Sequence, residues 1–147
     1  MALDFQLVID CADPHGLADW WADALGWDVE PQDEAFIRKM LDEGHAAEDD
    51  TTTHHGRLVW KTGAAINHPG GPDSGRPRIL FQLVPESKTV KNRVHIDLRP
   101  PQPDAEGQIA DLVAKGATLL GRGSEGPMTK WAVLTDPEGN EFCVPTS

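Results

Sequence analysis

The order of strand-like and helix-like segments repeats once along the chain, and this repeat constrains the fold more than any single motif. Residues 5–11 alternate apolar and polar side chains, which is typical of a half-buried strand. A helix follows, with a start signal at Asp13-Pro14 and a stop signal at Gly26. Residues 93–98 and 104–116 repeat the pair. The sequence therefore predicts an α+β protein of paired βαβββ modules that form a curved mixed sheet with the helices outside.

Further strands are expected after each helix. They are 27–29, 57–62 and 78–84 in the first half, and 117–121, 130–135 and 140–145 in the second. Residues 33–50 instead show helical spacing followed by an acidic run, which indicates an insertion of a helix and a loop at about 33–54. We expect a single domain over 1–147, with modules at about 1–86 and 91–147.

Composition excludes several classes of protein. The chain has 147 residues, 39% of them hydrophobic, which fits one globular domain, and it lacks the run of roughly 20 apolar residues that a membrane helix needs. Its formal net charge of −11 argues against nucleic acid as a partner. The first residues lack a basic, apolar leader pattern, so we expect a cytoplasmic protein with Cys11 and Cys143 as free thiols.

Four motifs occur in a characteristic order: FQLVIDCADP, ALGW, KNRVHIDLRP and DPEGNEFCV. With the repeat, they resemble the vicinal oxygen chelate superfamily, and within it the glyoxalase-like domains related to glyoxalase I, bleomycin-resistance proteins and extradiol dioxygenases. The resemblance implies a cup-shaped sheet whose first, fourth, fifth and eighth strands supply metal ligands, the ion acting as a Lewis acid. The corresponding positions are Gln6, Gln82 (or Phe81 in an alternative register), His95 and Cys143.

Two of these positions depart from the family pattern, because Gln82 and Cys143 stand where carboxylates are expected. Glu141, on the same strand face as Cys143, is a partial substitute. If a divalent metal binds, its candidate ligands are Gln6, His95 and Glu141. Without the two carboxylates, we expect the purified protein to carry no stoichiometric, tightly bound metal.

Other polar and aromatic residues are candidates for the same concave face. Asp97, two residues after His95, could orient the imidazole ring. Asp10 could anchor a polar ligand or simply pair with Arg99, and the simple pair is the favoured interpretation. Trp60 and Trp131 could stack on a ligand, with core or dimer packing as the alternative. His54 and His55 are interpreted as loop residues without chemistry, because adjacent strand residues point to opposite faces.

Two functional hypotheses follow. The first is a small-molecule-binding protein with a degenerate metal site, holding an amphipathic ligand between Gln6, Gln82, His95 and Cys143. The alternative is a metal-dependent lyase, isomerase or dioxygenase. A homodimer is also expected, from the superfamily's habits and from the apolar residues of the inserted helix, which are Phe36, Ile37, Met40 and Leu41.

Overall fold

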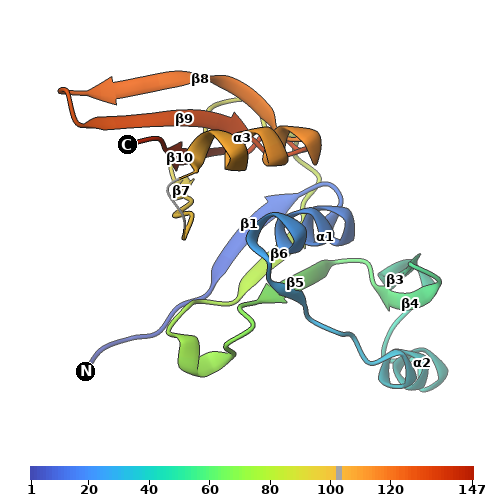
Figure 1. The fold of residues 1–147 in the computed structure, drawn as a ribbon. Coiled ribbons are helices and arrows are strands. Elements are labelled where there is room, and N and C mark those ends of the chain that lie inside the picture. The colour runs from blue at the N-terminus through green and yellow to red at the C-terminus, as the bar shows by residue number, and fades with distance from the viewer. Residues whose placement is uncertain (102–103) are drawn as a thin grey trace. The chain divides into compact units, whose positions relative to one another are not determined.

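The computed structural model describes residues 1–101 and 104–147, and the chain divides into two compact units, residues 1–87 and 88–147. Each unit contains a four-stranded mixed sheet and a helix that packs on one face of it (Figure 1). The two sheets have the same strand order, with the first and last strands of the unit paired in parallel at one side. The predicted α+β class of paired βαβββ modules is confirmed.

The first unit builds its sheet in the order β1-β6-β5-β2. Its elements are β1 (Leu7–Cys11), α1 (Pro14–Leu25), β2 (Asp28–Val29), α2 (Glu34–Asp42), a 3-10 turn (Glu48–Asp50), β3 (Thr51–His54), β4 (Arg57–Trp60), β5 (Gly63–Asn67), a second 3-10 turn (Pro72–Ser74) and β6 (Ile79–Leu83).

Helix α1 begins and ends at the residues that the sequence indicates. Asp13 accepts a hydrogen bond from the Gly16 amide at 3.1 Å, and Gly26 ends the helix with a left-handed φ of 68°. The helix packs on β5 and β6, where Ala64 and Ala65 are buried.

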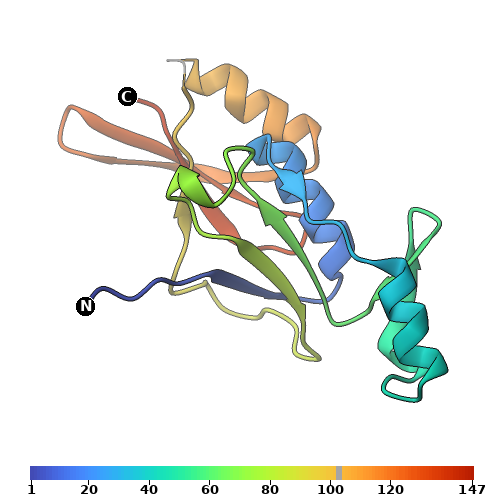
Figure 2. The same ribbon diagram turned by 90° about the horizontal axis from the view of Figure 1, so that it is seen from below.

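The insertion differs from the expected helix and loop. The strand expected over 57–62 is β4, which pairs with β3 and, within the described residues, with no strand of the four-stranded sheet. The third strand of that sheet is β5 at Gly63–Asn67, a segment not predicted as a strand. The alanines of β5 have little apolar character, so the sequence did not indicate a strand there. Figure 2 shows α2 and the β3–β4 hairpin lying together, away from the sheet of the same unit. Helix α2 packs on β4 and buries Ile37 completely, whereas Phe36 is 51% exposed, so the apolar face expected to be exposed is covered only in part within the chain.

The second unit has the strand order β7-β10-β9-β8. Its elements are β7 (Ile96–Asp97), α3 (Ala105–Ala114), β8 (Thr118–Glu125), β9 (Thr129–Thr135) and β10 (Glu141–Pro145). Helix α3 packs on β8 and β10 and buries Ile109 and Leu112, whereas Val113 is 43% exposed. No helix in the described part of the chain is long and apolar enough to cross a membrane.

Candidate ligand-binding site

A pocket of about 410 Å³ lies on the second unit, on the sheet face opposite α3. Strand alternation explains why: in β10 and β9, Phe142, Val144, Ala132 and Leu134 are fully buried, so the residues between them point to the other face. Residues on that other face that line the pocket are Trp131, Val133, Glu141, Cys143 and Pro145. The sheet therefore has one face in the core and one face available to a ligand.

The polar end of the pocket is formed by His95, Asp97 and Cys143. His95 precedes β7 and lies two residues before Asp97, and their Nε2 and Oδ1 atoms are 3.4 Å apart. Cys143 in β10 is the register partner of Asp97 in the parallel pair. The imidazole, carboxylate and thiol each offer one atom, all within 4.8 Å of one another.

The Cys143 side chain is a thiol rather than a thiolate at neutral pH. Burial raises its pKa, and the nearby negative charge of Asp97 raises it further, against a smaller opposing effect of Lys91. A raised pKa keeps the sulfur protonated and makes it a poor nucleophile. At this end of the pocket the side chains can donate and accept hydrogen bonds, and Asp97 supplies a negative charge.

Glu141 lies at the edge of this pocket, but its carboxylate is already bound. Lys88 Nζ donates to Oε1 at 2.7 Å and the Asn92 amide donates to Oε2 at 3.1 Å. Burial alone would raise the pKa of Glu141, but these hydrogen bonds and the charge of Lys88 outweigh it and hold the pKa at about 2. Glu141 therefore fastens the segment around Lys88 and Asn92 to β10, and a metal would have to displace Lys88 to use it.

Trp131 forms the aromatic wall of the pocket, and Gly123 makes room for it. Gly123 in β8 is the register partner of Trp131 in β9. A Cβ atom at Gly123 would lie 2.5 Å from Cε2 of the indole. The indole thus lies across the glycine backbone, which fixes the position of the ring at the pocket.

The other sequence candidates lie in the first unit. Gln6 precedes β1, and its Oε1 accepts a hydrogen bond from Arg78 at 3.0 Å. The same guanidinium forms two 2.8 Å hydrogen bonds with Glu30, and these, with Asn67, hold the pKa of Glu30 at about 2 despite the opposing effect of burial. The carbonyl oxygen of Gln6 is therefore engaged within its own unit.

Three further residues expected at the site also lie in the first unit, and they are Asp10, Gln82 and Trp60. Asp10 and Gln82 are register partners in the parallel β1–β6 pair, and both are exposed. Trp60 lies in β4, outside the four-stranded sheet, and its backbone bonds to Gln32 and His15. The structure therefore does not place Trp60 on the curved sheet where sequence analysis expected it.

The two units repeat one local pattern that the sequence analysis missed. Ile9-Asp10 lies opposite Phe81-Gln82 in the first unit, and Ile96-Asp97 lies opposite Phe142-Cys143 in the second. Both phenylalanines are fully buried. The repeated Ile-Asp and Phe-polar dipeptides are visible in the sequence and could have revealed this pattern. They place Gln82 beside Asp10 in the first unit and Cys143 beside Asp97 in the second.

These observations also test how well the side chains fit the divalent metal that the superfamily often uses. Gln6 and Glu141 are engaged by Arg78 and Lys88, so the set of Gln6, His95 and Glu141 does not fit. The cluster of His95, Asp97 and Cys143 offers one nitrogen, one oxygen and one sulfur. Such donors suit a borderline ion such as Zn²⁺, and they do not suit Mg²⁺, which prefers oxygen ligands.

The repeated βαβββ topology with a polar cluster on an open sheet face defines the class: the protein has the fold of the vicinal oxygen chelate superfamily. A family model described as "Glyoxalase-like domain" matches residues 6–145, so the chain belongs to the glyoxalase-like domain family. No curated protein matches the sequence.

Solved structures with the same fold have low sequence identity to this chain. A hypothetical protein from S. aureus is 13% identical with a TM-score of 0.62, covering 100% of this chain and 95% of its own. A glyoxalase/bleomycin resistance protein/dioxygenase family enzyme from Burkholderia phytofirmans is 15% identical with a TM-score of 0.59, covering 95% and 94%. A fosfomycin resistance protein from Listeria monocytogenes is 6% identical with a TM-score of 0.61, covering 99% and 93%. At these identities the likeness concerns the fold alone.

Proposed function

We propose that the protein binds an amphipathic small molecule in the pocket of the second unit, in a site that has lost the metal chemistry of its superfamily. The apolar part of the ligand lies against Trp131, Val133 and Pro145, and its polar group faces His95, Asp97 and Cys143. A pocket with an aromatic wall and a few convergent polar groups is typical of small-molecule sites.

One observation carries this proposal: Glu141 is paired with Lys88, and Cys143 is a thiol where the resemblance implies a carboxylate, so the polar end offers a divalent ion the single carboxylate of Asp97. Divalent ions need negative ligands to offset the loss of their hydration shell. A small molecule held by hydrogen bonds needs no negative groups from the protein. The pocket's chemistry therefore supports binding more than Lewis-acid catalysis.

A binding titration with the amphipathic dye 8-anilinonaphthalene-1-sulfonate tests the location of the site. The folded, chelator-treated protein should bind the dye at one site per chain, and Trp131→Ala should weaken binding by about twofold to tenfold, because an aromatic stacking contact contributes about 0.5–1.5 kcal/mol. Trp60→Ala is the matched control and should leave binding unchanged. Equal losses in both variants, or none in Trp131→Ala, would contradict the proposed site.

The alternative is a metal-dependent lyase, isomerase or dioxygenase, and the cluster of His95, Asp97 and Cys143 is the observation that favours it. Elemental analysis of protein purified from metal-supplemented medium separates the two functions. The enzyme hypothesis requires about one transition metal per chain that disappears in His95→Ala. The binding hypothesis requires that the His95→Ala change leave the metal content unaltered.

A further inference from the structure

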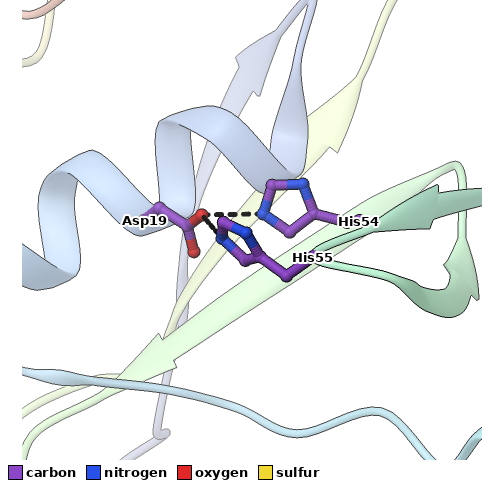
Figure 3. Close-up of side chains that lie close together, drawn as sticks. All are labelled: Asp19, His54 and His55. Atoms are coloured by element: carbon purple, nitrogen blue, oxygen red, sulfur yellow. Dashed lines mark hydrogen bonds and ion pairs between the residues drawn. The ribbon is translucent and has the colours of Figure 1, made fainter.

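A second cluster of metal-ligating side chains lies in the first unit, outside the pocket described above. Figure 3 shows Asp19, from α1, with both His54 and His55 turned toward it. The Nε2 atoms of His54 and His55 lie 2.7 Å and 2.6 Å from the same carboxylate oxygen, Oδ2 of Asp19. The three donor atoms lie within 4.8 Å of one another.

The hairpin turn explains how two adjacent histidines reach one carboxylate. His54 pairs with Arg57, so His55-Gly56 is a two-residue turn, and both residues have positive φ, 48° and 74°. Two positive φ values are the feature of a type I′ turn, which favours Asn-Gly over His-Gly. His55 therefore lies in the turn, outside the strand, and its side chain does not follow the strand alternation. The sequence-based expectation that the two rings point to opposite faces is wrong.

Contacts outside the cluster fix the hairpin against α1. His15 lies four residues before Asp19, on the same face of the helix, and its Nε2 is 2.7 Å from the carbonyl oxygen of Trp60 in β4. His15 is buried, and its ring lies 5.1 Å from that of His54. The hydrogen bond and the ring contact of His15 thus hold the hairpin beside the face of α1 that carries Asp19, which reduces the cost of bringing the three ligands together around an ion.

The donor chemistry decides which ligand suits the cluster. Without an ion, one carboxylate oxygen accepts hydrogen bonds from two imidazole N–H groups. A divalent cation could take the place of those two protons, with two nitrogen ligands and one anionic oxygen. This set suits borderline transition ions such as Zn²⁺, Ni²⁺ or Co²⁺ and does not suit Mg²⁺ or Ca²⁺. The His55 side chain is 75% exposed, so an ion can enter from solvent and keep water in its remaining positions.

We propose that Asp19, His54 and His55 form a zinc-type binding site that clamps the β3–β4 hairpin to α1. Asp19 supplies one carboxylate oxygen, each histidine supplies Nε2, and water completes the coordination. The site is open and has only three protein ligands, so the ion exchanges with solvent and is removed by chelators. The proposal is independent of the pocket in the second unit.

Calorimetric titration of chelator-treated protein with Zn²⁺ tests the proposal. We expect the wild type to bind zinc, and both Asp19→Asn and His55→Asn to weaken this binding by at least about tenfold, since even residues that only support metal ligands cost that much when removed. His55→Asn suits the turn, because asparagine is favoured at positive φ, so loss of zinc binding there does not reflect misfolding.

Two matched variants control for other sites. His45→Asn removes an exposed histidine that lies 3.6 Å from Glu43 without a second histidine, and it should leave zinc binding unchanged. Cys143→Ser removes a donor from the other cluster and should also leave the Asp19 site intact.

Hydrogen exchange distinguishes a zinc site from a cluster that is held by hydrogen bonds alone, because zinc would not alter exchange in the latter. Zinc should slow amide exchange in β3 and β4 of the wild type and raise its melting temperature by mass action, with neither effect in His55→Asn. The proposal is overturned if the wild type does not bind zinc, if Asp19→Asn and His55→Asn bind it as well as the wild type, or if Cys143→Ser alone abolishes binding.

Discussion

The Nε2 atom of His95, the residue just before β7, lies 3.4 Å from Oδ1 of Asp97, which ends that strand. Opposite them, Cys143 occupies the register position beside Asp97. The imidazole and the carboxylate thus have a defined relationship before any ligand binds. A ligand's polar group would meet a prearranged set of hydrogen-bonding partners.

Replacing Asp97 should change the reactivity of Cys143. The negative charge of Asp97 contributes to the raised pKa of the thiol, so Asp97→Asn should lower that pKa and speed alkylation by iodoacetamide at neutral pH. Mass spectrometry resolves this modification from that of Cys11, which is only 4% exposed. Asp10→Asn, at the matching position of the first unit, should leave the Cys143 rate unchanged. An equal or slower rate in Asp97→Asn would show that the carboxylate does not act on the thiol.

Gly123→Ala should displace the indole of Trp131. The added methyl would sit 2.5 Å from the ring, so we expect a loss of about 1–3 kcal/mol in the free energy of unfolding and weaker dye binding. Gly121→Ala in the same strand is the control, because no heavy atom lies within 4 Å of a Cβ there. Denaturant unfolding followed by circular dichroism measures the difference. Equal stabilities of the two variants would refute the proposed packing of Trp131.

Glu141→Gln should make the protein less stable at neutral pH. Because the pKa of Glu141 is about 2 in the folded protein and the ordinary value is 4.5, its contribution is complete above pH 4.5 and is lost as the pH falls through 2. The ion pair with Lys88 is partly solvated, so we expect a difference of about 1–2 kcal/mol at pH 7.

The difference between wild type and Glu141→Gln should shrink steadily as the pH is lowered from 4.5 toward 2. Chemical unfolding at a series of pH values measures it. Glu30→Gln gives a comparison with the same direction of pH dependence, because Arg78 lowers the pKa of Glu30 as well. A Glu141→Gln difference that stays constant from pH 7 to 2 would be inconsistent with the ion pair.

The expected homodimer has a second candidate surface. Helix α2 buries Ile37 but leaves Phe36 51% exposed, and β8 is an edge strand of its sheet whose Leu119 and Leu120 are 40% and 58% exposed. An exposed apolar edge favours pairing with a second copy. Light scattering should give about twice the 16.0 kDa chain mass, and Leu120→Lys should shift the protein toward monomer. A constant mass of one chain at every concentration would exclude the dimer.

The repeated fold was predictable because its signals are local. Period-2 alternation, the Asp13 cap and the Gly26 stop identify β1 and α1 without tertiary information. β3 and β5 were not predictable in the same way, because β3 is formed mostly of threonines and the alanines of β5 carry little apolar periodicity. β5 is instead held by its pairing with β2 and β6 and by its contact with α1.

The side chains expected at the site divide between the two units: those of the second unit line the pocket, whereas Gln6, Asp10, Trp60 and Gln82 lie in the first unit. Strand alternation brings His95, Asp97, Trp131 and Cys143 to one surface, and all four line the pocket. That Lys88 would engage Glu141, or Arg78 would engage Gln6, depends on contacts between segments far apart in sequence. The His54–His55 cluster was missed because its geometry depends on the left-handed backbone at His55.

Ligand binding with and without a chelator tests the central claim most directly. Titration of wild type and His95→Ala with 8-anilinonaphthalene-1-sulfonate, in parallel with elemental analysis of each sample, reports affinity and metal content together. We predict that the chelator leaves wild-type affinity unchanged, that His95→Ala weakens it with the fold intact, and that His95→Ala does not alter the metal content. One metal per chain that disappears in His95→Ala, together with binding that the chelator abolishes, would contradict a site without metal chemistry.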